Sequence, residues 1–236
     1  MNSININGIR TYCFSSRQEV IDLAFAEKKS LIAVSADKIL NATEQTRTII
    51  NKNIGYPDGV GAVMALKRNG FNNAIKIPGC ELWLDIVLNY YKQKSFYLVG
   101  SSVEVITQTV VKLKNEFQGI NILGYRDGYI KTNTERLQLI DDIIFKKPDV
   151  VFLAMGSPKQ EILMEEMQQN HPAVYQGLGG SFDVYIGLVK RAPSWWIKHN
   201  LEGAYRLMKQ PYKLKRFINA LPFWWYLIIG KYDQNN

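Results

Sequence analysis

Short apolar runs with the length of β-strands alternate along this chain with longer stretches of helical periodicity. The runs read LIAVS, FYLVG, INILGY, DVVFLAMG and AVYQGLGG. Helical patterns lie near residues 37–52, 58–69, 79–93, 102–118, 133–147 and 158–169. Strands that alternate with helices of about 10–15 residues are typical of βαβ units. The pattern therefore predicts an α/β fold of the Rossmann-like type, with a largely parallel sheet flanked by helices.

Composition limits the chemistry that such a fold can carry. The chain has 236 residues, 47% of them hydrophobic, which is enough for one large domain with a sizeable core. Its only histidines are His171 and His199, and it contains no Asp-x-Asp sequence. Its two cysteines, Cys13 and Cys80, show neither disulfide nor metal-ligand spacing. We therefore expect no metal site and no cofactor.

The C-terminal segment differs from the rest of the chain in charge and aromatic content. From Gly187 onward there are nine Lys and Arg residues against two acidic ones, a net charge of +7 out of +8 for the whole chain. Four of the five tryptophans lie there, two of them in LPFWWYLIIGK, which is too short to cross a bilayer. Pro193 marks the boundary between a core of residues 1–193 and an appendage of residues 194–236. The appendage suits an anionic membrane surface or nucleic acid, and its apolar run also suits a buried helix or an oligomer contact.

Two strand ends carry the pattern of a helix start. In AMGSPKQE, we expect Ser157 to cap a helix with Pro158 at its first position and Gln160 as the reciprocal partner of the cap. In VGSSVE, Ser101 is the expected cap. These residues either only begin their helices or present free backbone N–H groups to a diphosphate.

Other candidates lie in turns that follow predicted strands. Asp58 in GYPDGVG and Asp127 in YRDGYI, taken alone, fit turn residues better than catalysts. The glycines of GLGGSFD would let a backbone approach a ligand closely, but they lack the spacing of a dinucleotide fingerprint.

Taken together and in this order, YPDG, DGY, MGSPKQE, GLGGSFD, VKRAP and LEGAYRLMKQP resemble the WecG/TagA/CpsF glycosyltransferases, glycosyltransferase family 26. AMGSPKQEI and VKRAP are especially similar to the WecG branch, which acts in enterobacterial common antigen assembly. The resemblance implies an inverting, metal-independent enzyme on the cytoplasmic face of the bacterial inner membrane. It implies transfer of N-acetylmannosamine, its uronic acid or a related hexose from a UDP donor. The implied acceptor is a sugar linked to undecaprenyl diphosphate.

The resemblance also assigns roles to individual residues. Asp58 becomes the general base that deprotonates the acceptor hydroxyl, and Gln160 contacts the donor. Arg206, Lys213 and Arg216 match the family's essential arginines, so we expect them to hold the diphosphate leaving group. The remaining expected pocket residues are Thr43, Lys76, Asp127, Gly179 and Gly180.

This sequence departs from the family pattern at three positions. Ser35 stands where many relatives have asparagine, and Lys76 and Lys213 stand where they have arginine. Arginine binds phosphate through two parallel hydrogen bonds whereas lysine acts as a point charge, so these differences bear on which donor sugar is bound.

Two other classes of function fit the sequence less well. A different nucleotide-sugar enzyme, such as an epimerase or dehydrogenase, would require a dinucleotide fingerprint. A basic module that binds a membrane or nucleic acid would explain the appendage but would leave GSPKQE and YPDG without a purpose. We therefore expect a UDP-sugar, a lipid-linked acceptor and an anionic membrane as partners and no nucleic acid, while formation of a homo-oligomer stays open.

Overall fold

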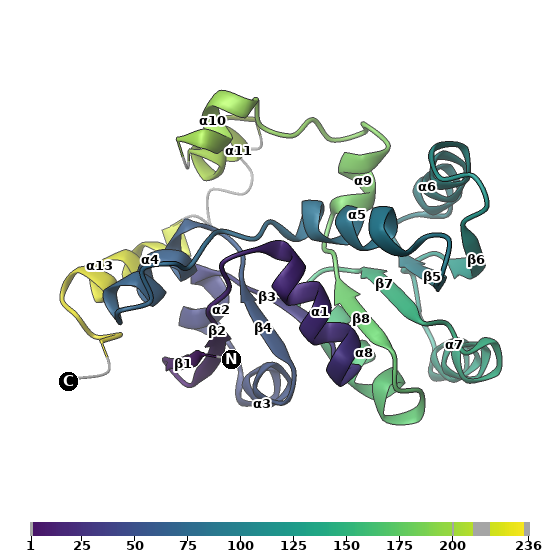
Figure 1. The fold of residues 1–236 in the computed structure, drawn as a ribbon, viewed down its shortest axis with the longest axis horizontal. Helices are drawn as coiled ribbons and strands as arrows, with labels where there is room; N and C mark the ends of the chain where they lie inside the picture. Colours follow the sequence, from purple (N-terminus) through teal and green to yellow (C-terminus); the bar gives the residue numbers. More distant parts are fainter. Residues whose placement is uncertain (1, 200, 210–217, 234–236) are drawn as a thin grey trace.

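A computed structural model describes residues 2–199, 201–209 and 218–233. Its centre is a six-stranded sheet in which every neighbouring pair is parallel, with the order β4-β3-β8-β7-β5-β6 (Figure 1). These strands are β3 (Leu31–Val34), β4 (Ile54–Pro57), β5 (Ser95–Gly100), β6 (Asn121–Arg126), β7 (Val150–Ala154) and β8 (Val174–Gly177). A separate antiparallel hairpin is formed by β1 (Ser3–Ile6) and β2 (Ile9–Tyr12). The predicted fold class is confirmed.

Helices cover both faces of the sheet. The buried side chains of one set join one apolar cluster; this set is α1 (Arg17–Glu27), α5 (Gly79–Tyr90), α6 (Val103–Glu116) and α9 (Ser181–Tyr185). The second set joins another cluster; it is α2 (Ala36–Asn41), α3 (Glu44–Lys52), α4 (Val60–Arg68), α7 (Asn133–Lys146) and α8 (Lys159–Asn170). Both clusters include strand residues, so the core lies on either side of the sheet.

Several elements are missing from the sequence prediction or divided differently. The prediction omits the hairpin, α1 and β4, whose four residues IGYP contain both glycine and proline and so lack a strand pattern. The predicted helix at 37–52 is two helices, because Ala42 leaves the helical conformation and Thr43 caps α3 by accepting a hydrogen bond from the Thr46 N–H.

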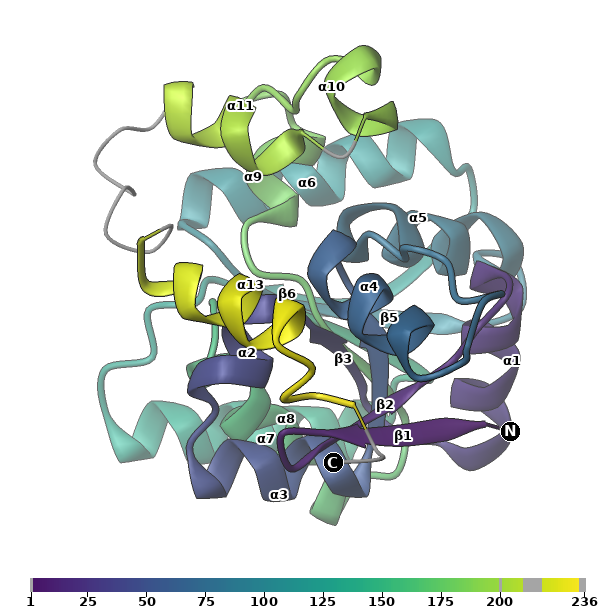
Figure 2. The same cartoon turned by 90° about the vertical axis from the view of Figure 1, so that its left-hand side faces the viewer.

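The C-terminal segment has two parts that pack differently. The helices α10 (Ser194–Lys198) and α11 (Glu202–Lys209) contact each other and stand apart from the sheet (Figures 1 and 2). Helix α13 (Leu221–Ile228) lies beside α2 and α4 in both views. Its Phe223 and Leu227 are buried in the same cluster as α2 and α4. One face of LPFWWYLI is therefore part of the core.

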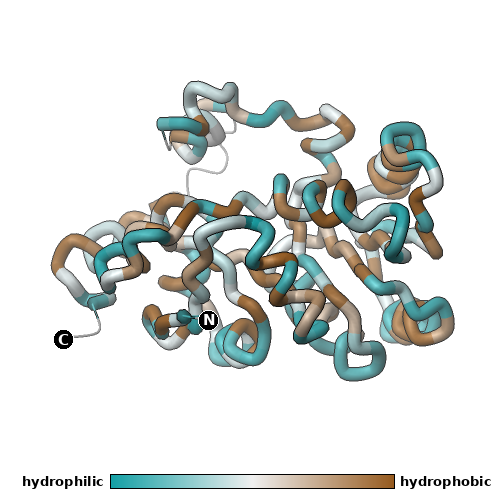
Figure 3. Tube along the Cα trace, viewed as in Figure 1, coloured by the Kyte–Doolittle hydropathy of each residue, from teal (hydrophilic) through white to brown (hydrophobic). Residues whose placement is uncertain are grey.

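The other face of α13 is apolar and exposed. Trp225 and Ile228 have exposed fractions of 62% and 68%, and Leu221 and Ile229 are half exposed. Figure 3 shows hydrophobic residues along this end of the chain. Among the described residues, no helix is long and apolar enough to cross a membrane.

Candidate active site

The sheet has a topological switch point between β5 and β7. The chain leaves β5 for α6, which packs on one face, and leaves β7 for α8, which packs on the other. In open α/β sheets, ligands bind beyond the carboxyl ends of the strands at such a point. The loops that follow β5, β6, β7 and β8 are therefore the place to look for chemistry.

The loop after β5 is tightly held. A Cβ on Gly100 would stand 2.4 Å from the Ala154 carbonyl oxygen, so only glycine allows these two strand ends to approach this closely. Ser101 has a φ of +53°, a left-handed conformation that non-glycine residues adopt rarely and mostly near functional sites. Its hydroxyl donates to the Asp183 carboxylate at 2.8 Å, which ties this loop to α9.

Ser101 is therefore not the helix cap that the sequence predicts. Ser102 caps α6 instead, with its hydroxyl accepting a hydrogen bond from the Val105 N–H. Two consecutive serines precede the helix, so spacing alone could not choose between them. Asp183 was missed as a functional residue, and its place in GLGGSFD after a predicted strand was the available signal.

Gln160 also differs from the prediction. Helix α8 begins at Lys159, its N-cap is Pro158, and no side chain caps it. The expected capping box of Ser157 with Gln160 is therefore wrong. Gln160 is instead 5% exposed, and its amide oxygen accepts from the Gly156 N–H at 3.1 Å and the Gly179 N–H at 3.0 Å. It joins the loops that follow β7 and β8.

A buried ion pair lies next to Gln160. Glu161, in the first turn of α8, is 1% exposed and pairs with the Lys38 ammonium of α2 at 2.7 Å. Burial alone would raise the pKa of Glu161, but the charge and hydrogen bond of Lys38 outweigh it and hold that pKa below its ordinary value. Sequence analysis did not identify either residue, since a buried pair between distant helices leaves no local pattern.

Asp58 directly follows β4, at the same end of the sheet as the loops that follow β7 and β8. Its backbone N–H donates to the Val34 carbonyl of β3 at 2.9 Å, which fixes the turn. Its side chain is half-buried, and its charge acts on the buried Tyr56 and on the half-buried Cys80. Burial first, then the charge of Asp58, raises the pKa of Tyr56. Asp58 thus provides a half-buried carboxylate at the carboxyl end of β4.

The space beside Asp58 is open. Gly59 has a φ of +99°, and apart from its own chain neighbours no described residue comes within 4 Å of the position that a Cβ on it would take. The same is true of Gly156, Gly179 and Gly180 in the loops after β7 and β8. At Gly61, by contrast, a Cβ would stand 2.8 Å from the ring of Phe223, so this glycine admits α13. Gly61 therefore leaves no space for an acceptor, unlike Gly59.

The other predicted pocket residues are more dispersed. Thr43 caps α3 and bonds to Thr46 within its own turn. Lys76 lines a depression together with the first turn of α1 and with Asp85 of α5. The next residue, Ile77, is tied to the end of β4, because its N–H donates to the Pro57 carbonyl. Asp127 accepts from the Tyr129 N–H at 2.8 Å and shapes the turn after β6.

Of the predicted cations in the appendage, Arg206 lies in α11 and its side chain is outside the described part of the structure. Lys213 and Arg216 lie outside the described residues altogether. Arg191, in VKRAP, is described: it pairs with Glu81 in the first turn of α5, and Glu81 also pairs with Arg17 of α1. Arg191 thereby anchors the chain just before α10.

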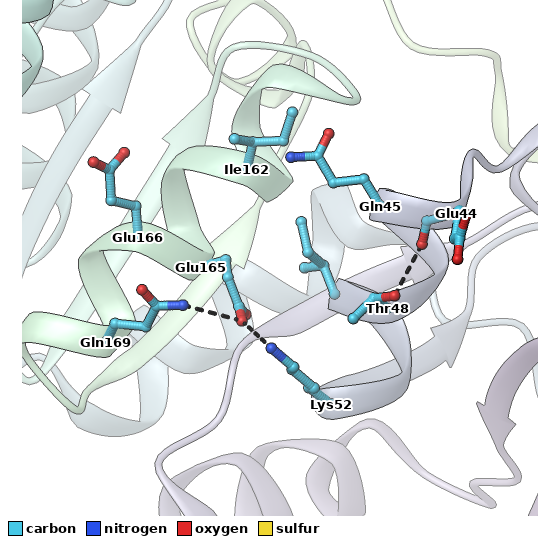
Figure 4. Close-up of a pocket in the computed structure, with 9 residues that line it drawn as sticks. Glu44, Gln45, Thr48, Lys52, Ile162, Glu165, Glu166 and Gln169 are labelled. Atoms are coloured by element: carbon cyan, nitrogen blue, oxygen red, sulfur yellow. Dashed lines mark hydrogen bonds and ion pairs between the residues drawn. The ribbon is translucent and has the colours of Figure 1, made fainter.

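A groove of about 560 Å³ runs between α3 and α8 (Figure 4). Its lining includes Lys52 and Glu165, which form an ion pair at 3.0 Å, and the side chains of Ile162 and Gln45. None of the predicted site residues whose side chains the structure describes lines this groove. We therefore do not assign the active site to this groove, despite its volume.

Within residues 2–199, 201–209 and 218–233, no group of three or more His, Cys, Asp or Glu side chains is placed to hold a metal ion. What the carboxyl ends of the strands offer is a half-buried carboxylate beside open space and glycine loops with accessible backbone. This set suits proton abstraction from a bound hydroxyl.

Comparison with protein families identifies the family of this chain. A family model described as the glycosyl transferase WecG/TagA/CpsF family matches residues 4–236, nearly the whole chain. The resemblance carried by GSPKQE, VKRAP and the other motifs is thus confirmed. The chain belongs to the WecG/TagA/CpsF family and is a glycosyltransferase of surface polysaccharide biosynthesis.

Proposed function

We propose that this glycosyltransferase moves a hexose from a UDP donor to a sugar linked to undecaprenyl diphosphate, with inversion and without a metal ion. The hexose is N-acetylmannosamine, its uronic acid or a related sugar. The observation that carries the proposal is the position of Asp58, a half-buried carboxylate at the carboxyl end of β4 next to the open space at Gly59. An inverting transfer needs one such base within reach of the attacking hydroxyl.

The reaction follows from that arrangement in one displacement. Asp58 accepts the proton of the acceptor hydroxyl while the hydroxyl oxygen attacks the anomeric carbon of the donor. The bond from that carbon to the β-phosphate oxygen breaks, and UDP leaves with the electron pair. Negative charge therefore develops on the diphosphate, and we assign its stabilisation to Arg206 and Arg216, with Lys213 as a further contact. The remaining proposed contacts to the substrates are Gln160, Gly179, Gly180, Asp127, Thr43 and Lys76.

The acceptor resides in a membrane, so we also propose that the chain binds the cytoplasmic face of the bacterial inner membrane as a peripheral protein. The support is the exposed apolar face of α13, with Trp225 and Ile228 more than half exposed, and the +7 net charge of residues 187–236. Tryptophan favours the headgroup level of a bilayer, and each Lys or Arg near an anionic surface contributes about 1 kcal/mol.

The test is a transfer assay with the full-length chain, a set of UDP-sugars and a synthetic lipid-diphosphate N-acetylglucosamine. We expect one UDP-sugar to give a product heavier than the acceptor by one sugar residue, with equimolar release of UDP and no loss of rate in excess EDTA. Conversion of the donor without any change in the acceptor would instead support a nucleotide-sugar-modifying enzyme. A rate that disappears with EDTA and returns with Mg²⁺ or Mn²⁺ would overturn the metal-free mechanism.

A further inference from the structure

Three side chains connect α2 with both glycine loops at the carboxyl edge of the sheet. The Lys38 ammonium contacts Glu161 Oε1 at 2.7 Å, and the Gln160 amide nitrogen donates to the same oxygen at 3.2 Å. The Gln160 amide oxygen then accepts from the N–H groups of Gly156 and Gly179. We call this set the Lys38–Glu161–Gln160 network.

These three side chains contribute little to the stability of the fold. Glu161 is 1% exposed, and its second oxygen, Oε2, is buried and has no hydrogen-bond partner among the described residues. An unpaired buried acceptor costs about 1–3 kcal/mol. A buried ion pair is often no more stabilising than apolar side chains of similar volume. Stability alone therefore gives little reason to have a carboxylate at this position.

The geometry shows what the carboxylate does. The Gln160 amide has one oxygen and one NH₂ group, and the two glycine N–H groups can be satisfied only by the oxygen. Glu161 accepts from the NH₂ group and so selects that orientation, while Lys38 keeps Glu161 charged. The amide packs against Gly177 of β8, where a Cβ would stand 2.4 Å from its nitrogen, so only glycine at this position leaves room for it. The Gln160 amide oxygen thus sets the distance between the loops at Gly156 and Gly179.

We propose that Lys38 and Glu161 are positioning residues for sugar transfer: they orient the Gln160 amide and thereby hold the Gly156 and Gly179 loops at the spacing that the bound donor requires. The inference rests on the proposed function for the identity of that donor. Neither residue needs to touch the substrate. A displacement of about 1 Å in a substrate-binding element can cost about 10²-fold in rate.

The kinetic test compares Glu161→Gln and Lys38→Met with the double variant Lys38→Met/Glu161→Met. Each single variant leaves a buried group unpaired, so Tm and transfer rate should both fall. The double variant removes both charges, so we expect Tm to return close to the wild-type value. Its transfer should stay impaired, by about 10- to 100-fold in kcat/KM for the UDP-sugar. If the double variant regains both Tm and kcat/KM, the pair is only structural and the proposal is wrong.

Glu165→Gln is the matched control. Glu165 lies one turn further along α8 and pairs with Lys52 of α3, where the lysine is 59% exposed (Figure 4). Its loss removes an ion pair between the same helix and the same side of the molecule without touching Gln160. We expect its kcat/KM to match the wild type, and a loss as large as that of Glu161→Gln would contradict a specific role for Glu161.

A second measurement needs no substrate. Amide hydrogen exchange, followed by NMR, reports directly on the Gly156 and Gly179 N–H groups. We expect both to exchange at least about 10-fold faster in the double variant Lys38→Met/Glu161→Met, which has no acceptor for the Gln160 NH₂ group, than in the wild type, with distant amides unchanged. Unchanged exchange at both glycines overturns the positioning role whatever the substrate is. Faster exchange in a protein whose wild type transfers no sugar supports the positioning role and overturns the proposed function instead.

Discussion

The loops at the carboxyl edge of the sheet and the helix α13 are held in place by different forces. At the edge, the contacts are directional: Gln160 accepts from two backbone N–H groups, and Ser101 donates to Asp183. On α13, the contacts are apolar: Phe223 is fully buried and stacks on Tyr232. A substitution at the edge should therefore change geometry and rate, whereas one in α13 should change stability or membrane affinity.

Removing everything after Pro193 should have the largest effect. The sequence predicts that residues 1–193 form a folded, more soluble core, but Phe223, Leu227 and Tyr232 belong to the same cluster as α2 and α4. We expect the truncated chain to have no detectable transfer and a lower Tm, because it exposes the apolar surface that α13 covers. Tm from circular dichroism and transfer to a short, water-soluble acceptor are the measurements.

The water-soluble acceptor removes the need for a membrane, and a chain that ends at Asp233 is the control for truncation itself. If the 1–193 chain matches the full-length protein with this acceptor, the appendage is only an anchor. A full-length Tm in the same experiment would restore the original expectation of an independent core.

Replacing Asp58 with asparagine comes next. Loss of a general base typically lowers the rate by about 10²- to 10⁴-fold. The variant should fold normally, because the backbone N–H of residue 58 still bonds to the Val34 carbonyl. Turnover under saturating substrates and UDP affinity by calorimetry separate the two effects. Near-wild-type turnover would remove Asp58 from the mechanism.

Arg206→Ala and Arg216→Ala should lower turnover by about 10²- to 10³-fold, the usual cost of removing one group that stabilises charge in a transition state. The assay again uses the water-soluble acceptor, so loss of membrane affinity does not contribute. Lys215→Ala is the control, since it removes one positive charge from the same segment. Equal losses in all three variants would show that total charge matters rather than these two arginines.

The sequence predicted more of the architecture than of the site. Alternating apolar and amphipathic segments are a property of neighbouring residues, so the parallel sheet and most helices could be predicted from them. The exact helix starts could not be predicted, because Ser101 and Ser102 have the same chemistry. Only the structure shows that Ser101 takes a left-handed conformation after β5 and that Ser102 caps α6. The Lys38–Glu161 pair joins residues that are 123 positions apart, and no local pattern encodes such a contact.

Phe223→Ala tests the buried face of α13. Truncation of a buried phenylalanine to alanine costs about 3–5 kcal/mol of the free energy of unfolding. Phe223 is 0% exposed and contacts Gly61 of α4, so we expect a value in that range from urea denaturation. A loss below about 1 kcal/mol would mean that α13 does not pack on the core in solution.

Trp225→Ala tests the opposite face of the same helix and should have the smallest effect on folding. Trp225 is 62% exposed, and substitutions at exposed positions usually change stability by about 0.5 kcal/mol or less. On a membrane the result should differ, because burying a large apolar side chain contributes about 1.5–3 kcal/mol and each 1.4 kcal/mol is about tenfold in affinity. We therefore expect binding to anionic liposomes to weaken at least about tenfold at unchanged Tm. Phe145→Ala is the matched control, since Phe145 is an 84% exposed aromatic on α7, away from α13. Equal loss of liposome binding in both variants would mean that exposed aromatics act non-specifically, and α13 would then not be the membrane-binding surface.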